Sequence, residues 1–141
     1  MTGWDLIDRT DLLHAIAAAG LPTDAETCGS AQIVRFNPEW IRDTFIPYLD
    51  RNRRAPQGDG YRCVHFVHWM IEALNEAGYD ARIPTSHGCA KAHCVLHSRE
   101  AHAVGLLTTT DNQLYVLDPQ DPKLVPLADY PVLAWSRVRF L

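Results

Sequence analysis

Residues 58–78 read GDGYRCVHFVHWMIEALNEAG, and this stretch gives the clearest prediction of structure in the chain. Its apolar side chains recur at the spacing of a helix, at Val67, Met70, Ile71, Leu74 and Ala77. Gly78 supplies a stop, so the stretch predicts a helix over residues 64–77 behind a glycine-rich loop. Cys63 stands where the loop meets the helix, and there the free backbone N–H groups and the helix dipole favour a thiolate.

The composition limits what the chain can be. Its 141 residues are 47% apolar, and 13 basic against 17 acidic side chains give a formal charge of −4. We expect a single domain over residues 1–141. Nucleic acid is not an expected partner, since the basic cluster at 51–54 is short, and neither is a membrane, since no apolar stretch approaches the roughly 18 residues of a membrane helix. The amino terminus lacks the pattern of a secretory signal. The protein is therefore expected to be cytoplasmic as synthesised, with export as an effector left open, and its four cysteines to be reduced.

The elements around this helix predict an α+β fold. Ahead of it, we expect a helix over residues 11–19, a short strand over 32–36 and a helix from 37 that Pro47 bends or ends. After it, strand patterns cover residues 79–83, 101–109, 114–117 and 132–141, with a hairpin turn at 110–113. The prediction is a helical part (1–55), a core (56–121) and a C-terminal strand (122–141). Helices would thus be followed by an antiparallel sheet.

Two further residues complete a constellation for thiol chemistry. A thiolate needs an imidazole to hold its proton, and the imidazole needs an acceptor to orient it. His102 lies on one predicted strand and Asp118 ends the next, sixteen positions later across the hairpin turn. Strands of that length can bring the two side chains together beside Cys63, so the three residues form the candidate site.

The motifs around these residues resemble a known family. Tyr61-Arg62-Cys63-Val64-His65-Phe66, His102-Ala103-Val104 and Leu117-Asp118-Pro119-Gln120 look like the papain-like cysteine hydrolases in their compact, NlpC/P60-type form. They are most similar to the small cysteine-protease domain attached to a mushroom agglutinin and to its bacterial and phage relatives. The resemblance covers residues 56–121. It implies a compact papain-like domain with the nucleophile at the start of a central helix.

The resemblance also implies roles for four residues. Cys63 would be the nucleophile, His102 the general base and acid, Asp118 the residue that orients the imidazole, and Gln57 part of the oxyanion hole. The implied function is a thiol hydrolase or acyltransferase that acts on amide or peptide bonds through an acyl-enzyme. The implied substrate is a peptide, a protein or a peptidoglycan-like polymer, and no cofactor is required.

Two alternatives stay open. The segment Ser86–His97 is rich in metal-ligating side chains, and a zinc module would draw its ligands from Cys89, His93, Cys94 and His97. That set converges only if the segment is helical, because a strand would turn His93 and Cys94 to opposite faces. The other alternative is an inactive papain-like domain that binds a partner without turnover. Neither the oligomeric state nor the identity of the substrate follows from the sequence.

Overall fold

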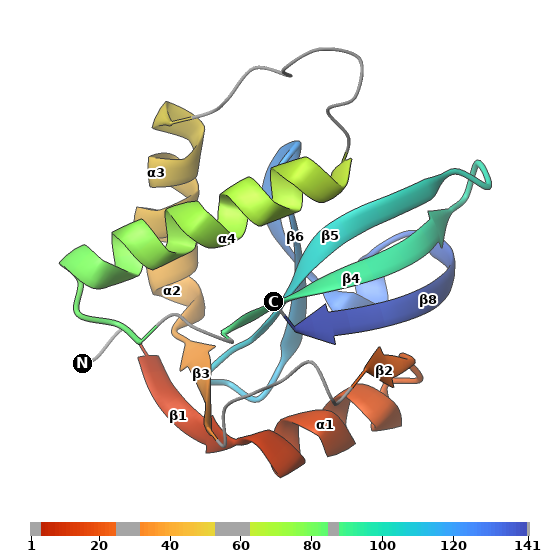
Figure 1. The fold of residues 1–141 in the computed structure, drawn as a ribbon, viewed down its shortest axis with the longest axis horizontal. Helices are drawn as coiled ribbons and strands as arrows, with labels where there is room; N and C mark the ends of the chain where they lie inside the picture. Colours follow the sequence, from red (N-terminus) through yellow and green to blue (C-terminus); the bar gives the residue numbers. More distant parts are fainter. Residues whose placement is uncertain (1–3, 25–31, 53–62, 85–87, 141) are drawn as a thin grey trace.

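The computed structural model describes residues 4–24, 32–52, 63–84 and 88–140 (Figure 1). The first half contains β1 (Trp4–Asp8), α1 (Arg9–Ala18), β2 (Thr23–Asp24), β3 (Gln32–Phe36), α2 (Pro38–Trp40), the π-helical turn η2 (Ile41–Phe45) and α3 (Ile46–Arg51). The long helix α4 (Cys63–Asp80) follows. The second half contains β4 (Cys89–Leu96), β5 (Ala101–Thr108), β6 (Leu114–Asp118), β7 (Asp121–Pro126), the 3-10 turn η3 (Leu127–Asp129) and β8 (Val132–Phe140).

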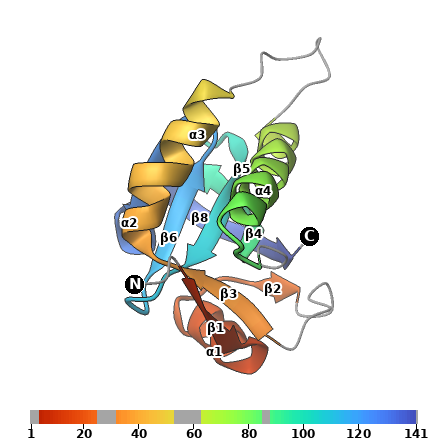
Figure 2. The same ribbon diagram turned by 90° about the vertical axis from the view of Figure 1, so that its left-hand side faces the viewer.

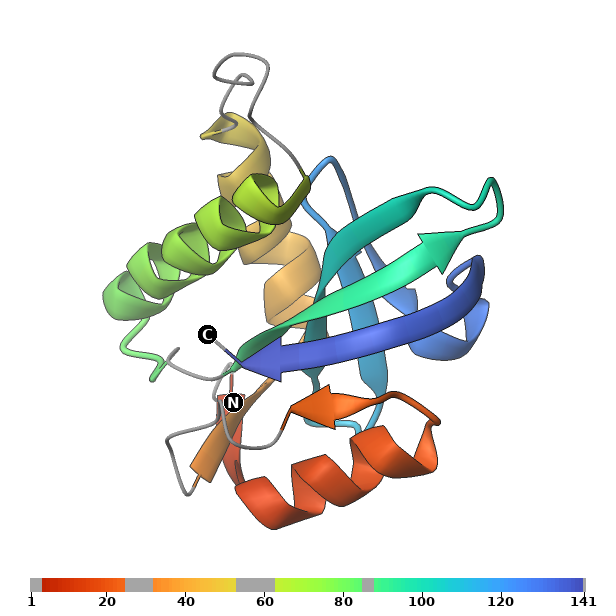
Figure 3. The same cartoon turned by 45° about the vertical axis from the view of Figure 1, so that its right-hand side comes forward.

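The strands form two sheets. A two-stranded antiparallel sheet joins β1 to β3, with Trp4 opposite Phe36. A six-stranded sheet has the order β2-β8-β4-β5-β6-β7, and its pairs are antiparallel except β2 with β8. Strand β8 therefore lies between β2 and β4. Helix α4 and the run from α2 to α3 lie together, whereas α1 lies beside β2 (Figures 2 and 3).

Two clusters of buried side chains hold these layers together. The first joins α4, the α2–α3 run, β3 and one face of the sheet, and it includes Phe36, Phe45, Met70, Leu107 and Leu117. The second joins α1 to the opposite face, and it includes Leu12, Ile16, Ala92, Val104 and Val138. Both faces of the central strands are thus covered. This explains why β5 is apolar along most of its length and does not alternate between apolar and polar residues.

The helices begin and end for local reasons. Helix α4 contains the predicted helix 64–77 and buries its apolar face, including Val67, Met70 and Leu74. Helix α1 begins at Arg9, earlier than the predicted residue 11, because Asp8 is its N-cap and the Asp8 carboxylate accepts a hydrogen bond from the Thr10 N–H at 2.9 Å. Among the described residues, no helix is long and apolar enough to cross a membrane.

The predicted fold class is wrong in its arrangement. The chain does not divide into helices and then an antiparallel sheet, because β1, β2 and β3 lie in the first part and β2 joins the main sheet in parallel with β8. The helical run passes Pro47 and ends at Arg51, since Pro47 falls in the first turn of α3, where its missing N–H is no loss. The strand expected at 79–83 is instead the end of α4 and a turn in which Arg82 has a positive φ.

Gly105 lies in β5 directly beneath α4. A Cβ atom added there would overlap Met70 Cε and lie 3.1 Å from both Cys89 Sγ and the Leu117 carbonyl oxygen. We expect Gly105→Ala to lower the free energy of unfolding by about 1–3 kcal/mol, because the packed core must shift. Urea unfolding measures this effect, and Met70→Leu, which removes the overlapping methyl, should recover part of it in the double variant. Unchanged stability in Gly105→Ala would show that the core adapts freely.

Candidate functional site

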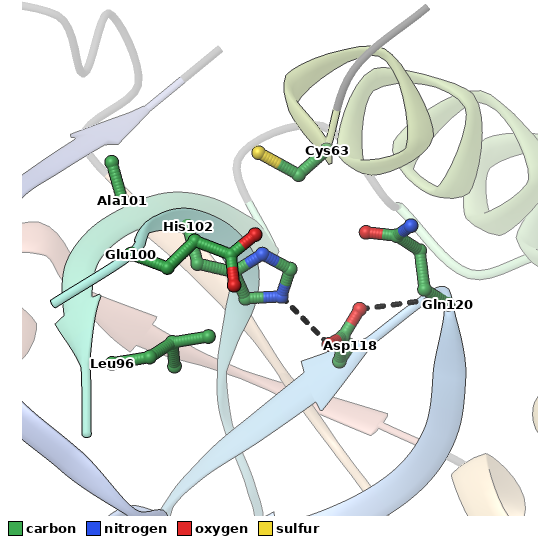
Figure 4. Close-up of a pocket in the computed structure, with 7 residues that line it drawn as sticks. All are labelled: Cys63, Leu96, Glu100, Ala101, His102, Asp118 and Gln120. Carbon is green, nitrogen blue, oxygen red and sulfur yellow. Dashed lines mark hydrogen bonds and ion pairs between the residues drawn. The ribbon is translucent and has the colours of Figure 1, made fainter. Parts of the chain in front are cut away.

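A pocket of about 530 Å³ opens at the amino end of α4 (Figure 4). Its lining residues come from α4, the ends of β4, β5 and β6 and their turns: Cys63, Leu96, Glu100, Ala101, His102, Asp118 and Gln120. Four of these seven side chains are polar, namely Glu100, His102, Asp118 and Gln120. Cys63 adds a half-buried thiol. The pocket is therefore a polar site with a small apolar wall.

A fixed pair of side chains forms the floor of this pocket. His102 Nε2 lies 2.8 Å from Asp118 Oδ2, and the two side chains are only 13% and 15% exposed. The other carboxylate oxygen, Oδ1, accepts a hydrogen bond from the Gln120 N–H at 2.9 Å. The antiparallel pairing of β5 with β6 brings the first residues of one strand close to the end of the other. Both oxygens of Asp118 are thus engaged, which fixes the orientation of the imidazole.

The electrostatics of the pair favour a charged imidazole. The hydrogen bond that the His102 imidazole donates to Asp118 raises the pKa of His102, burial opposes this effect, and the charges of Asp118 and Glu100 add to it. An imidazolium donates from both ring nitrogens. One donor is used by Asp118, so the second is available to a group in the pocket.

Cys63 faces the pair from the other side of the pocket. It is the first residue of α4, and in Figure 4 its side chain and the Asp118 carboxylate lie on opposite sides of the His102 ring. The structure therefore brings Cys63, His102 and Asp118 into one pocket from three different elements. This arrangement can place a thiol, an imidazolium and a carboxylate around one bound group.

Sequence reasoning missed other lining residues of this pocket. Gln57 falls outside the described residues. Gln120, whose amide points into the pocket in Figure 4, was visible only as the end of the motif Asp118-Pro119-Gln120. Leu96 and Glu100 flank the tight turn between β4 and β5, where Arg99 has a positive φ. Leu96 and Glu100 line the pocket because β4 pairs with β5, and no local motif predicts that pairing.

The zinc alternative lacks the geometry that it needs. Cys89, His93 and Cys94 lie on strand β4 rather than on a helix, and His97 lies in the turn beyond it. Cys89 packs in the cluster beside α4, and the alternation of a strand places Cys94 on the opposite face. Burial raises the pKa of Cys89 to about 12 and that of Cys94 to about 11. Within the described ranges, no three His, Cys, Asp or Glu side chains are placed so that they could hold a metal ion.

Ten solved chains are similar to this one, among them the following two structures. One is titled as a complex of PSL1a with E64 and has a TM-score of 0.69 at 12% identity, covering 96% of this chain and 50% of that one. The other is the Polyporus squamosus lectin bound to the human-type influenza-binding epitope Neu5Acα2-6Galβ1-4GlcNAc, with a TM-score of 0.66 at 12% identity over 96% and 49%. The chain thus spans about half of each of these structures. No family model and no curated protein matches the chain.

These findings correct the family and the function predicted from the sequence. Neither of these two structures is named as a papain-like hydrolase, and one of them, whose fold this chain shares, is named as a lectin. The predicted resemblance to papain-like cysteine hydrolases, the predicted thiol hydrolase or acyltransferase and the peptide-type substrate are therefore contradicted. The sequence alternative that agrees better with the comparisons is a domain that binds without turnover.

Proposed function

We propose that this protein is a ligand-binding domain and that the pocket of Cys63, His102, Asp118 and Gln120 is its binding site. The observation that carries the proposal is the 2.8 Å contact between His102 and Asp118 on the pocket floor. A donor held in place before the ligand arrives loses little conformational entropy on binding. The pair therefore suits recognition of a ligand by directed hydrogen bonds.

The lining chemistry favours a ligand with several hydroxyl groups. Glu100 and Asp118 offer acceptors, the imidazole of His102 offers a donor, and the amide of Gln120 offers both. Ala101, Leu96 and the thiol of Cys63 provide a less polar wall for carbon-bound hydrogens. A sugar has both kinds of surface, and a pocket of about 530 Å³ matches the size of small-molecule sites. The sugar epitope bound by the similar lectin agrees with this ligand class.

A titration with two ligands tests the site. We expect the trisaccharide Neu5Acα2-6Galβ1-4GlcNAc or E64, the ligands named for the similar structures, to bind and to shift the NMR signals of pocket residues. Gln120→Ala should weaken binding by about tenfold, because one pair of hydrogen bonds is lost. Gln113→Ala, in the exposed turn between β5 and β6, is the matched control. Equal affinities of the two variants would place the ligand elsewhere.

The cysteines give an independent test of access to the pocket. Cys63 is half-buried, whereas Cys89 and Cys94 are 3% and 2% exposed and have raised pKa values. We expect iodoacetamide near neutral pH to label Cys63 well before these two buried thiols, since the thiolate is the reactive form. Peptide mass spectrometry measures each site, and a bound ligand should slow labelling at Cys63 alone. Amide hydrolysis that disappears in Cys63→Ser would overturn the proposal of binding without turnover.

A further inference from the structure

Strand β8 is irregular where it runs beside the wall of the pocket. It pairs with β4, and the register between the two strands shifts twice. At each shift β8 contains one extra residue, Leu133 at one and Ser136 at the other. Each is a β-bulge, a feature that is common beside binding sites and changes the direction of a side chain. The two bulges therefore decide which side chains of β8 stand next to those of β4.

The bulge at Ser136 determines the direction of Trp135. Arg137 pairs with His93. Regular pairing from there would set Ser136 opposite Cys94 and turn Trp135 to the other face of the sheet. Because Ser136 is an extra residue, Trp135 takes the place opposite Cys94 instead. The bulge thus sets the indole of Trp135 on the same face as the side chain of Cys94.

The other bulge determines the direction of Val132 in the same way. It sets Val132 opposite Leu96, which belongs to the pocket wall. Cys94, the partner of Trp135, also pairs with His102 on the pocket floor. Directly opposed residues in an antiparallel pair project to the same side, with their Cβ atoms about 5 Å apart. Val132 and Trp135 therefore lie on the same face of the sheet as Leu96 and His102.

Tyr130 adds a second aromatic ring at this place. Its ring centroid lies 6.0 Å from that of Trp135, and the two ring planes are inclined by 31°. The Tyr130 N–H donates a hydrogen bond to the Leu127 carbonyl at 3.3 Å, which holds the turn between η3 and β8. Burial raises the pKa of Tyr130, and the charge of Asp118 on the pocket floor adds to this effect. Both rings are half-buried, so part of each packs on the core and part is accessible.

We call Tyr130, Val132 and Trp135 the aromatic shelf, and this shelf begins where the pocket ends. Strand β4 lies between β8 and β5, so Trp135 is two strand spacings, or about 10 Å, from His102. The three strands run side by side in Figure 1. Leu96 of β4 connects the two regions, because it lines the pocket and pairs with Val132. A ligand longer than one ring can therefore reach both the pocket and the shelf.

We propose that the aromatic shelf is a second subsite, which holds the second ring of an oligosaccharide whose first ring occupies the pocket. This inference rests on the proposed function and defines its ligand more closely. A sugar ring has an apolar face of C–H groups and a rim of hydroxyl groups. The ring faces of Tyr130 and Trp135 match the apolar face, and their O–H and N–H groups can bond to the rim. The shelf thus selects an oligosaccharide over a single sugar.

Comparing an oligosaccharide with its parts tests the second subsite. Isothermal titration of the full chain measures the affinity for Neu5Acα2-6Galβ1-4GlcNAc and, separately, for N-acetylneuraminate, galactose and N-acetylglucosamine. We expect the trisaccharide to bind at least about tenfold more tightly than the best single sugar, because it contacts both subsites. Equal affinity for the trisaccharide and the best single sugar would overturn the second subsite.

Replacing the rings separates the shelf from the pocket. Tyr130→Leu and Trp135→Leu keep an apolar side chain on the core, and each should lose about tenfold in trisaccharide affinity with single-sugar affinity unchanged. Tyr79→Leu is the matched control, since Tyr79 is 82% exposed near the far end of α4. Gln120→Ala, in the pocket, should weaken both kinds of ligand. A parallel loss for both kinds in the shelf variants, or no loss for either, would overturn the subsite.

A measurement on the wild type keeps the test decisive if a shelf variant does not fold. The indole N–H signal of Trp135 should shift in NMR spectra with the trisaccharide and stay in place with the single sugar that binds best. Pocket signals that shift with the trisaccharide while Trp135 does not would overturn the second subsite and leave the proposed function standing. If the wild type binds none of these saccharides, the proposed sugar ligand fails, and the second subsite fails with it.

Discussion

Replacing Asp118 by asparagine is expected to lower the pKa of His102 and to remove most of the pH dependence that this pair gives to folding. Asparagine keeps an acceptor for the Gln120 N–H but carries no charge, so the change acts mainly on the 2.8 Å contact with His102. Hydrogen bonds to charged groups contribute about 1.5–3 kcal/mol, and we expect a loss in that range near pH 6. Ligand binding in the pocket should weaken as well, because the imidazole loses its fixed orientation.

The sign of the pH dependence follows from the raised pKa of His102 in the folded state. Protonation then favours folding, so the stabilisation is fully present below the unfolded pKa of about 6.5. It is lost as the pH rises through the folded pKa. The difference in unfolding free energy between wild type and Asp118→Asn should therefore shrink as the pH is raised from about 6 to about 9.

Two measurements check this expectation. An NMR titration of the His102 ring gives its pKa in each protein, and urea unfolding across the same pH range gives the stability difference. Asp129→Asn, an exposed carboxylate in η3, is the control and should change neither quantity. A His102 pKa that stays the same in Asp118→Asn would show that the imidazole is charged for another reason.

Phe36→Ala is expected to cause the largest loss of stability, about 3–5 kcal/mol, because a fully buried aromatic side chain is removed. Phe36 is 0% exposed and its ring stacks on Trp40 with centroids 6.1 Å apart. Its carbonyl accepts a hydrogen bond from the Thr110 N–H at 2.9 Å, and its backbone bridges Thr109. The residue thus joins the small sheet, the main sheet and the helical run that begins with α2.

Urea unfolding by fluorescence and by circular dichroism measures the effect of Phe36→Ala. Leu6→Ala, on the neighbouring strand β1 but 41% exposed, is the matched control and should cost less than about 1 kcal/mol. If Phe36 joins the layers into one unit, both probes should report the same, earlier transition. Separate transitions would mean that the small sheet unfolds independently of the main sheet.

Elements with a strong local pattern are predictable from the sequence. Helix α4 follows from its apolar spacing, and the β5–β6 hairpin follows from two apolar strands around the turn at 110–113. The sequence of β4 suggests a metal-ligand segment, although Ala90, Ala92 and Cys94 alternate there with Lys91 and His93. That alternation of period two is the signal of a strand, and the density of histidine and cysteine obscured it.

Pairings between distant segments were not predictable. Strands β1 and β2 are short, and their partners β3 and β8 are chosen by tertiary packing rather than by local sequence. In the candidate site, too, some residues are placed by local structure and others by pairings between distant segments. His102 and Asp118 meet because a local hairpin places them, whereas Leu96, Glu100 and Gln120 join the pocket only once the whole sheet has formed. The family and function inferred from the motifs were wrong, since short motifs fix neighbours in space but not chemistry.

The position of β8 has a consequence for how the chain reaches its fold. Because this strand lies between β2 and β4, a nascent chain that ends before Val132 leaves the edge of β4 without its partner and β2 without a sheet. An uncovered strand edge is a template for aggregation, and contacts between distant parts of a chain form slowly. We therefore expect β2 to stay undocked during synthesis until residues 132–140 have left the ribosome, whereas β1 and β3 can pair with each other before then. The docking of β2 onto the main sheet thus waits for β8.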